Sequence, residues 1–482
     1  MRRLDRVRMI RCLLTSLLLG MAAMSAQAQT SAAASDDEEL PRYSAEPCCT
    51  LCPRARDADV YLTRFMQDHQ EALQGRGDWL FRSQSELNTE FPINDQVLAD
   101  LARMVKAFKA HGTEVLMLDF PPRGVLHADQ LLPGDRARFN DKLALANYRA
   151  ALQRFRTAGF IVPDYGLLAE RGDGTEYFFH RDGHWTPDGA RRTAELIAST
   201  LKGTPLLAGL TKRAYVTTRI GRNRHPGVMS IVAQQICGGH YPSEVVLGYK
   251  TDATETDLFA DEPVPEIALV GTSFSATPTY HFAGFLKQNL QTDVLNVSLS
   301  GGNFDGALTQ YLLSEDFQKR PPKLVIWEFG HPQIAAANPG QMRRIVPLVN
   351  NGCADRATLL SSTTPINTAT DFTDLLFNGG GRILDARSRD LVIDLQFGDP
   401  AVSEFLAETW YLDGKHEVQR VRLNDYTRSG GRFVLETNRE PEYIEQPVIA
   451  FRVQVVTKLA KPTTVTAKLC RTTAPLVARQ AP

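Results

Sequence analysis

The sequence predicts an α/β region built on a parallel sheet, followed by an all-β sandwich. Two observations lead to this prediction. From about residue 57 to residue 346, short apolar runs alternate with amphipathic stretches, whereas after Cys353 the helical period disappears and short strand-like runs follow one another. Alternating strands and helices are typical of a parallel sheet covered on both faces, and closely spaced strands separated by turns are typical of a sandwich. The 482 residues suffice for both regions.

Each expected element of the first region is a short apolar run or an amphipathic stretch. The expected strands are residues 115–120, 160–162, 267–270, 294–299 and 324–329. The expected helices include residues 143–158, 190–201, 280–290 and 308–313. Ligands of such sheets bind at the carboxyl ends of the strands, so residues that directly follow a strand are the first candidates for a site.

The last region should hold several short strands. Runs that alternate, or that are rich in Val, Thr and aromatic residues, cover residues 389–397, 409–412, 418–423, 432–435, 448–457 and 463–469. Turn signals separate them, including Asp413-Gly414 and Ser429-Gly430-Gly431. Strands of this length and spacing predict a sandwich or jelly roll.

Composition and charge exclude several classes of protein. Apolar residues make up 43% of the chain and charged residues 23%, which is ordinary for a globular protein and excludes a disordered or multi-span membrane chain. The 54 basic and 55 acidic side chains nearly balance, which argues against a dedicated nucleic-acid binder. We therefore expect no nucleic-acid partner.

The start of the chain has the pattern of a cleaved secretory signal. Five arginines precede residue 12, an apolar run extends to residue 23, and Ser-Ala-Gln-Ala ends at Ala28. The apolar run is too short to span a bilayer, although an uncleaved anchor is the alternative. We expect cleavage after Ala28 and a periplasmic mature protein without a membrane span. The expected segments are the signal 1–28, an α/β domain 29–347 and a sandwich 348–482.

Six cysteines remain after the signal: Cys48, Cys49, Cys52, Cys237, Cys353 and Cys470. An even number in an exported protein indicates disulfides, but spacing alone leaves fifteen pairings open. Cys353 and Cys470 would close the last region as one loop. The N-terminal cluster with Cys237 and His240 is also compatible with zinc, which we consider the weaker alternative.

The first candidate for chemistry is the motif around Asp182 and His184. Thr186 is a plausible helix N-cap with Pro187 at the first helical position, so Asp182 and His184 should lie in the turn before a helix. A carboxylate beside an imidazole holds the tautomer that a general base requires and stabilises the imidazolium. A surface turn is the alternative, and a zinc site that includes His180 is another.

The second candidate is Ser273, which follows the buried-type strand 267–270 and Gly271-Thr272. At the carboxyl end of a parallel strand, backbone N–H groups can hold a developing oxyanion, and a serine there can act as nucleophile if a base reaches it. A helix-capping role is the alternative, and Ser275 competes for both roles. Together with Asp182 and His184, Ser273 predicts a Ser-His-Asp triad. A zinc site would leave this element unexplained, so we expect no metal.

Five further residues are candidates for binding a substrate. Asn303 follows Ser300-Gly301-Gly302 and could donate to an oxyanion, or simply belong to a strand-to-helix loop. Arg123 follows Pro121-Pro122 and could bind an anionic substrate, or face solvent. In the sandwich, Trp410 with Arg420 and Arg422 could stack on and pair with acidic sugars, although aromatic residues of a sandwich more often lie in its core.

The two motifs together resemble the alginate O-acetyltransferases that combine an SGNH-hydrolase-like domain with a C-terminal carbohydrate-binding module. An Asp-x-His-Trp-x-x-x-Gly-Ala block at residues 182–190 precedes a strand-Gly-Thr-Ser-x-Ser block that ends at Ser275. This order is permuted relative to ordinary SGNH hydrolases, in which the serine comes first. Residues 46–53, 77–82 and 282–287 support the resemblance, which covers essentially the whole mature chain.

The resemblance implies a role for individual residues. Ser273 would be the nucleophile, His184 the general base and Asp182 the residue that orients it. Cys52–Cys237 and Cys353–Cys470 would be the two disulfides, which leaves Cys48 and Cys49 over. Trp410 would contact the polymer, although residues 405–409 beside it include no basic residue.

The resemblance also implies an activity. The protein would transfer acetyl groups through an acyl-enzyme to hydroxyls of mannuronate residues in alginate, with an external acetyl donor and no bound cofactor. Its partners would be an anionic polysaccharide and other alginate biosynthesis and secretion proteins. An acetyl esterase of the same fold and a non-catalytic polymer-binding scaffold are the alternatives.

Overall fold

The computed structural model describes residues 51–170, 176–254, 264–366, 371–381 and 383–472. The expected signal 1–28, together with Cys48 and Cys49, lies outside the described residues. No helix in the described ranges has both the length and the apolar character needed to cross a membrane.

Four parallel strands in the order β3-β8-β6-β7 form the sheet that the sequence predicts. They are β3 (Glu114–Asp119), β8 (Leu324–Phe329), β6 (Ile267–Val270) and β7 (Val294–Asn296). Most of their residues are buried, as expected for strands covered on both faces. The predicted strand 160–162 is wrong, because Ile161 forms only a single bridge beside β3.

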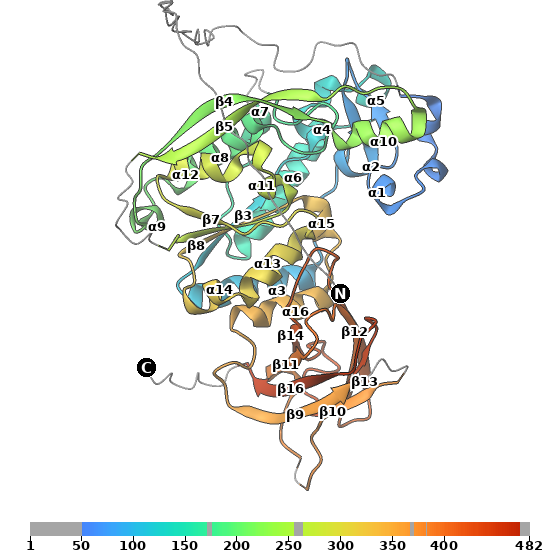
Figure 1. The fold of residues 1–482 in the computed structure, drawn as a ribbon, viewed down its shortest axis with the longest axis vertical. Coiled ribbons are helices and arrows are strands. Elements are labelled where there is room, and N and C mark those ends of the chain that lie inside the picture. The colour runs from blue at the N-terminus through green and yellow to red at the C-terminus, as the bar shows by residue number, and fades with distance from the viewer. Residues whose placement is uncertain (1–50, 171–175, 255–263, 367–370, 382, 473–482) are drawn as a thin grey trace, which may run out of the picture. The chain divides into compact units, whose positions relative to one another are not determined.

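Six longer helices flank this sheet. They are α3 (Asp95–Ala110), α6 (Asp141–Thr157), α8 (Pro187–Leu201), α12 (Phe282–Leu290), α13 (Asn303–Leu313) and α16 (Pro339–Val349). Helix α8 packs against α12, whereas α3 and α13 both pack against α16 (Figure 1). Thr186 caps α8 through Gly189 N–H at 3.1 Å, with Pro187 at the first position, as the sequence predicts.

Short helices complete the α/β region. The α-helices are α1 (Arg64–Gln67), α2 (Ser83–Glu86), α4 (Arg123–Leu126), α5 (Pro133–Arg136), α7 (Leu167–Glu170), α9 (Pro205–Ala208), α11 (Ser273–Ala276), α14 (Glu315–Lys319) and α15 (His331–Ala335). The 3-10 helices are η1 (Pro53–Arg56), η2 (Ala58–Val60), η3 (Ala128–Gln130) and η4 (Pro278–Tyr280), and η5 (Ser388–Asp390) lies in the sandwich. Helix α11 begins at Ser273, the predicted nucleophile.

Two antiparallel strand pairs were not anticipated from the sequence. One pair is β1 (Ala72–Gln74) with β2 (Leu80–Arg82). The other is long and joins β4 (Tyr215–His225) to β5 (Glu244–Ala253), with α10 (Val228–Cys237) between them. Many residues of β4 are polar and exposed, so this strand lacks the apolar run that marks the strands of the central sheet.

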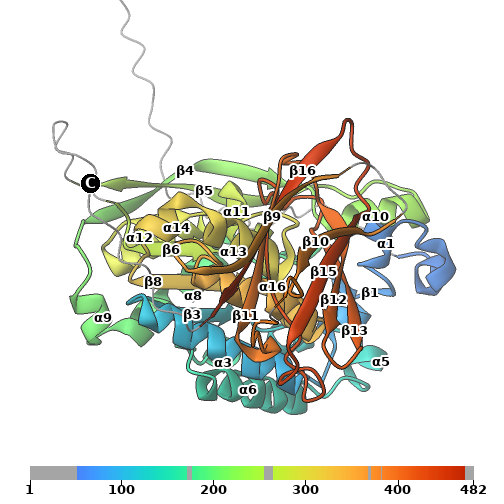
Figure 2. The ribbon, with the colours of Figure 1, turned by 90° about the horizontal axis from the view of Figure 1, so that it is seen from below.

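The last region is the predicted sandwich of two antiparallel four-stranded sheets. One sheet has the order β10-β15-β12-β13 and the other β14-β11-β16-β9. In chain order the strands are β9 (Thr358–Ile366), β10 (Thr373–Phe377), β11 (Leu391–Phe397), β12 (Glu404–Tyr411), β13 (His416–Arg422), β14 (Arg432–Glu436), β15 (Val448–Val455) and β16 (Thr463–Arg471). Figure 2 shows β12, β13 and β15 lying side by side. Strands β9 and β10 were not predicted from the sequence.

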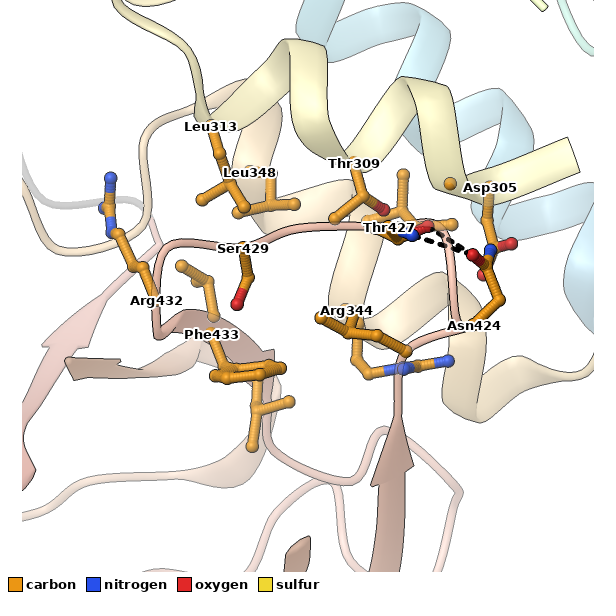
Figure 3. A pocket seen from close by; sticks show the side chains of 15 residues that line it. Asp305, Thr309, Leu313, Arg344, Leu348, Asn424, Thr427, Ser429, Arg432 and Phe433 are labelled. Carbon is orange, nitrogen blue, oxygen red and sulfur yellow. Dashed lines mark hydrogen bonds between the residues drawn. The ribbon is translucent and has the colours of Figure 1, made fainter. Parts of the chain in front are cut away.

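The sandwich is joined directly to the α/β region. Helix α16 packs on β14, and Arg343 holds Glu417 of β13 with Nη1 to Oε1 at 2.5 Å. A pocket at this junction lies between α13, α16 and residues 423–435 (Figure 3). It encloses only about 30 Å³, which is room for water rather than for a substrate. The predicted domain boundary after residue 347 stays a prediction, and it falls within the last turn of α16.

Two disulfides join cysteines that are far apart in the sequence. Cys52 binds Cys237 and Cys353 binds Cys470, which confirms the pairing that the family resemblance implies. The zinc alternative is therefore wrong for Cys52 and Cys237, because neither sulfur is a thiolate.

Replacing both Cys353 and Cys470 by Ser should destabilise the sandwich by about 2–4 kcal/mol, because the bridge closes a long loop and restricts the unfolded chain. Urea unfolding followed by tryptophan fluorescence measures this loss. The Cys52→Ser/Cys237→Ser variant serves as the control, since its sandwich keeps its own bridge. An unchanged sandwich midpoint in Cys353→Ser/Cys470→Ser would contradict the expectation.

Candidate active site

The structure brings the three predicted triad residues together. Ser273 is the first residue of α11, directly after β6, and its Oγ lies 2.7 Å from Nε2 of His184. Nδ1 of His184 lies 2.5 Å from Oδ1 of Asp182. An ionised carboxylate only accepts hydrogen bonds, so Nδ1–H donates to Asp182 and Nε2 accepts from the Ser273 hydroxyl. This is the arrangement of a nucleophile, a general base and the group that orients it.

Asp182 is a buried carboxylate held by donors on both of its oxygens. Oδ1 also accepts the N–H of His184 at 2.9 Å, and Oδ2 accepts Nε2–H of His225 at 2.8 Å and the N–H of Val228 at 2.9 Å. Burial raises the pKa of Asp182, but the charges and hydrogen bonds of His184 and His225 outweigh it and hold the pKa well below the usual value. Asp182 is therefore ionised wherever the protein is folded near neutral pH.

Sequence reasoning missed His225, because its only signal is a histidine at the end of a polar strand 43 residues from Asp182. Its ring stacks on Phe179, with centroids 4.1 Å apart. The hairpin β4–β5 thus supplies a second imidazole to the triad carboxylate.

Glu328 of β8 fixes the turn that carries Ser273. It is fully buried, and its two oxygens accept the backbone N–H and the side-chain O–H of Thr272, each at 2.8 Å. A side chain at Gly271 would overlap the Glu328 carboxylate, so glycine is required there. Burial raises the pKa of Glu328 above its usual value, although the hydrogen bonds from Thr272 oppose this effect. Glu328 carries no motif, only its place at the end of an apolar strand.

Aromatic side chains surround His184. The ring of His184 lies 4.5 Å from that of Phe274 and 5.4 Å from that of Tyr280. Phe120 stacks on Phe274 at 4.0 Å, and Trp185 donates from Nε1 to the Phe274 carbonyl at 3.0 Å. These rings restrict solvent around the imidazole, which strengthens its electrostatic interactions.

The predicted role of Arg123 in binding a substrate is wrong. Its side chain is 1% exposed. Nη1 lies 2.7 Å from Glu86 and also donates to the carbonyl of Leu80, while Nη2 donates to the carbonyls of Phe179 and His180. The proline pair before it suggested an exposed turn, but the guanidinium folds inward, where Glu86 and the carbonyls replace water. Arg123 therefore shapes the chain that leads to the triad.

Asn303 lies at the start of α13 in the left-handed region, with φ of 59°. Its Oδ1 accepts the N–H of Phe304 at 2.8 Å, and its role as an oxyanion donor stays a prediction. A different asparagine contacts the segment that carries the nucleophile: Asn296, at the end of β7, donates from Nδ2 to the Ser275 carbonyl at 2.8 Å.

Trp410 lies on the outer face of the sheet β10-β15-β12-β13. Its ring stacks on His416 with centroids 4.5 Å apart, and the guanidinium of Arg452 lies 5.6 Å from its ring centre. His416 and Arg452 come from the neighbouring strands β13 and β15, which is why residues 405–409 showed no basic partner. Both partners also contact the buried carboxylate of Glu408, so Trp410 belongs to a cluster of aromatic and paired charged side chains.

Arg420 and Arg422 lie further along β13 and share Glu404. Arg420 contacts it with Nε to Oε1 at 2.5 Å, and the two arginine side chains are 63% and 59% exposed. Four residues separate Arg420 from His416, which is about 13 Å along a strand. The structure therefore does not gather Trp410 and the two arginines into one cluster.

His180 belongs to a buried charged group beside the triad. Its Nδ1 lies 2.5 Å from Asp78 and its Nε2 lies 3.1 Å from Glu176. Burial lowers the pKa of His180, but Asp78 and Glu176 raise it more, to about 9. These two ion pairs hold His180 in place.

A raised pKa in the folded protein means that protonated His180 stabilises the fold below about pH 6.5 and that this stabilisation is lost as the pH rises through about 9. The free energy of unfolding should fall across this window by up to about 3 kcal/mol. Denaturant unfolding at several pH values measures it. The His180→Gln variant should not show this decrease in the free energy of unfolding, whereas the His416→Gln variant, altered at an exposed site, should still show it. Identical pH profiles in wild type and His180→Gln would contradict the assignment.

Replacing Glu328 by Gln should slow the reaction of Ser273 with a fluorophosphonate about 10- to 100-fold. Both Glu328 oxygens accept hydrogen bonds from Thr272, and the amide NH2 of Gln cannot accept one. One Thr272 donor would then lose its acceptor, and the turn would become disordered. The matched control is Glu436→Gln, which removes another buried carboxylate, one paired with Arg103. Equal labelling rates in wild type and Glu328→Gln would show that the turn does not need Glu328.

Comparison with known proteins finds relatives along nearly the whole chain. A family model described as an SGNH hydrolase-like domain, acetyltransferase AlgX, matches residues 72–331, and one for a C-terminal carbohydrate-binding module matches residues 352–481. The alginate biosynthesis protein AlgX of Pseudomonas syringae pv. tomato is 36% identical over 460 residues, covering 94% of this chain and 95% of that protein. The solved structure of Pseudomonas aeruginosa AlgX matches with a TM-score of 0.79 and 33% identity, covering 88% of this chain and 100% of that one.

A second group of relatives matches over about half of the chain. The probable alginate O-acetylase AlgJ of Pseudomonas aeruginosa is 29% identical, covering 55% of this chain and 71% of that protein. The matches confirm the expected SGNH-hydrolase-like domain followed by a carbohydrate-binding module. With a family match over more than half of its length and relatives along nearly all of it, the chain belongs to the AlgX family of alginate biosynthesis proteins.

Proposed function

We propose that the protein is an O-acetyltransferase that acetylates hydroxyls of mannuronate residues in alginate. The observation that carries this proposal is the continuous hydrogen-bonded path from Ser273 Oγ through His184 to Asp182, at 2.7 and 2.5 Å. It lies in a domain of acetyltransferase type, in a family of alginate biosynthesis proteins. An external acetyl ester supplies the acetyl group, and no resident cofactor takes part.

In the first half-reaction Ser273 Oγ attacks the acetyl carbonyl of the donor, and His184 Nε2 takes the hydroxyl proton. The imidazolium that forms donates to ionised Asp182, which stabilises it. We assign the developing oxyanion to the backbone N–H of Ser273, at the start of α11. As the bond between the acetyl carbon and the donor oxygen breaks, His184 returns the proton to the leaving oxygen, which leaves an acetyl ester on Ser273.

In the second half-reaction a mannuronate hydroxyl enters where the donor alcohol has left. His184 takes the hydroxyl proton while the sugar oxygen attacks the acetyl carbon of the acyl-enzyme. The bond to Ser273 Oγ then breaks, and His184 gives the proton back to that oxygen. Water in place of the sugar hydroxyl would yield free acetate, so exclusion of water decides between transfer and hydrolysis.

We infer that the sandwich holds the polymer. Trp410 offers a ring on which a sugar can stack, and Arg452, whose Nε already pairs with Glu408, offers the guanidinium beside that ring to a uronate carboxylate. Both disulfides fit an oxidising compartment, so we place the protein in the periplasm with other alginate biosynthesis and secretion proteins as partners.

Replacing Ser273 by Ala should abolish acetyl transfer, with a loss of at least about 10³-fold, because no other hydroxyl is hydrogen-bonded to His184 among the described residues. Mass spectrometry of polymannuronate oligosaccharides, incubated with the protein and a surrogate acetyl ester, measures the transfer. Equal melting temperatures of wild type and variant serve as the control.

Acetylated sugar with Ser273→Ala would contradict the proposal. Free acetate without acetylated sugar in the wild type would favour an esterase. No turnover together with polymer binding that is indifferent to Ser273 would favour a scaffold.

A further inference from the structure

A second charged group lies directly beside the triad: the guanidinium of Arg82, the last residue of β2. Its Nε donates to Oε1 of Glu86 at 2.7 Å, and its backbone N–H donates to Oε2 of the same carboxylate at 3.1 Å. The Arg82 side chain is 25% exposed, whereas that of Glu86 is 4% exposed. Glu86 thus holds the Arg82 side chain in place, while part of that side chain stays accessible to solvent.

Glu86 holds two arginines at once. Its Oε2 also lies 2.7 Å from Nη1 of buried Arg123. Burial raises the pKa of Glu86, but Arg123 and Arg82 lower it more, so the carboxylate is ionised. The single negative charge of Glu86 neutralises only one of the two guanidinium groups, so the group of three side chains carries a net charge of +1. Of the two arginines, Arg82 is the one that solvent reaches.

The guanidinium of Arg82 packs on Gly183, the residue between Asp182 and His184. A Cβ atom at Gly183 would lie 2.8 Å from Cζ of Arg82, so glycine is required for the guanidinium to reach this position. The glycine between the two triad residues therefore has a physical explanation, namely the close approach of Arg82.

The two terminal nitrogens of Arg82, Nη1 and Nη2, have no hydrogen-bond acceptor among the residues that the structure describes. A guanidinium whose Nε is already used presents its free N–H groups in a fixed plane. That plane matches a carboxylate, which arginine binds through two parallel hydrogen bonds. The ligand chemistry that fits this position is therefore a carboxylate on a molecule that also reaches His184.

We propose that Arg82 binds the carboxylate of the acceptor uronate residue and thereby directs a hydroxyl of that sugar to His184 and the acyl-enzyme. This inference rests on the proposed function and adds a specificity determinant to it. Each uronate residue carries one carboxylate and several hydroxyls on the same sugar ring. A fixed contact between Arg82 and the carboxylate therefore also fixes the positions of the hydroxyls. A polymer of neutral hexoses has no carboxylate for Arg82 to bind and gains no affinity from it. Arg82 therefore selects acidic sugars as acceptors.

The test compares two acceptors: polymannuronate oligosaccharides and the same oligosaccharides with their carboxyl groups reduced to alcohols. In Arg82→Gln the KM for polymannuronate should rise about 10- to 100-fold, while the KM for the reduced acceptor should equal that of wild type. Hydrolysis of the surrogate ester and fluorophosphonate labelling of Ser273 should stay within about twofold. Arg82→Lys should give an intermediate KM, because it keeps the charge without the planar fork.

The matched control is Arg138→Gln, which removes a positive charge from a side chain that is 80% exposed in another part of the domain. Equal losses with both acceptors, or slower Ser273 labelling in Arg82→Gln, would overturn the proposal in favour of a structural role. An unchanged KM for polymannuronate would also overturn it.

A second measurement separates failure of this inference from failure of the proposed function. If wild type acetylates neither acceptor, the proposed function fails. The role of Arg82 is then tested by measuring how far each oligosaccharide protects Ser273 from labelling by the fluorophosphonate. Polymannuronate should protect wild type and Arg138→Gln but not Arg82→Gln, and the reduced oligosaccharide should protect none of the three. Absence of protection in wild type, or equal protection in Arg82→Gln, would overturn the proposal.

Discussion

The buried charge of Asp182 is the constraint on which the rest of the site depends. A carboxylate removed from water has to be matched by donors, and here they come from three places: the turn at His184, the end of the hairpin strand at His225, and the first residue of α10. These segments can meet only if the hairpin β4–β5 lies across the turn that precedes α8. Packing of the hairpin is therefore inseparable from the electrostatics of the triad.

The same principle recurs around the site. Glu328 fixes the turn that carries Ser273, and Glu86 holds Arg82 and Arg123 against the chain that leads to Asp182. Each carboxylate is buried and each is matched by donors from a segment distant in the sequence. A site assembled in this way is rigid because moving any segment would leave a charge unmatched in the interior.

The sequence was informative where a pattern is local. Apolar runs located the strands of the central sheet, and a Pro after a Thr located the start of α8. Asp182, His184 and Ser273 were found because each follows a strand or precedes a helix in a recognisable way. The order of the two motifs indicated the family.

What the sequence did not show was the set of partners supplied by other segments. Arg123 was misread because nothing local marks its inward orientation toward Glu86. His225 was missed because a single histidine in a polar strand has no periodic signal. The basic partners of Trp410 lie on adjacent strands, and strand pairing is a long-range property.

Helix α10 has a further consequence. It begins at Val228, whose N–H donates to Asp182, and it ends at Cys237, which is bridged to Cys52. A single helix thus connects the carboxylate of Asp182 to the Cys52–Cys237 bridge, so the disulfide restrains the element whose first N–H matches that buried charge.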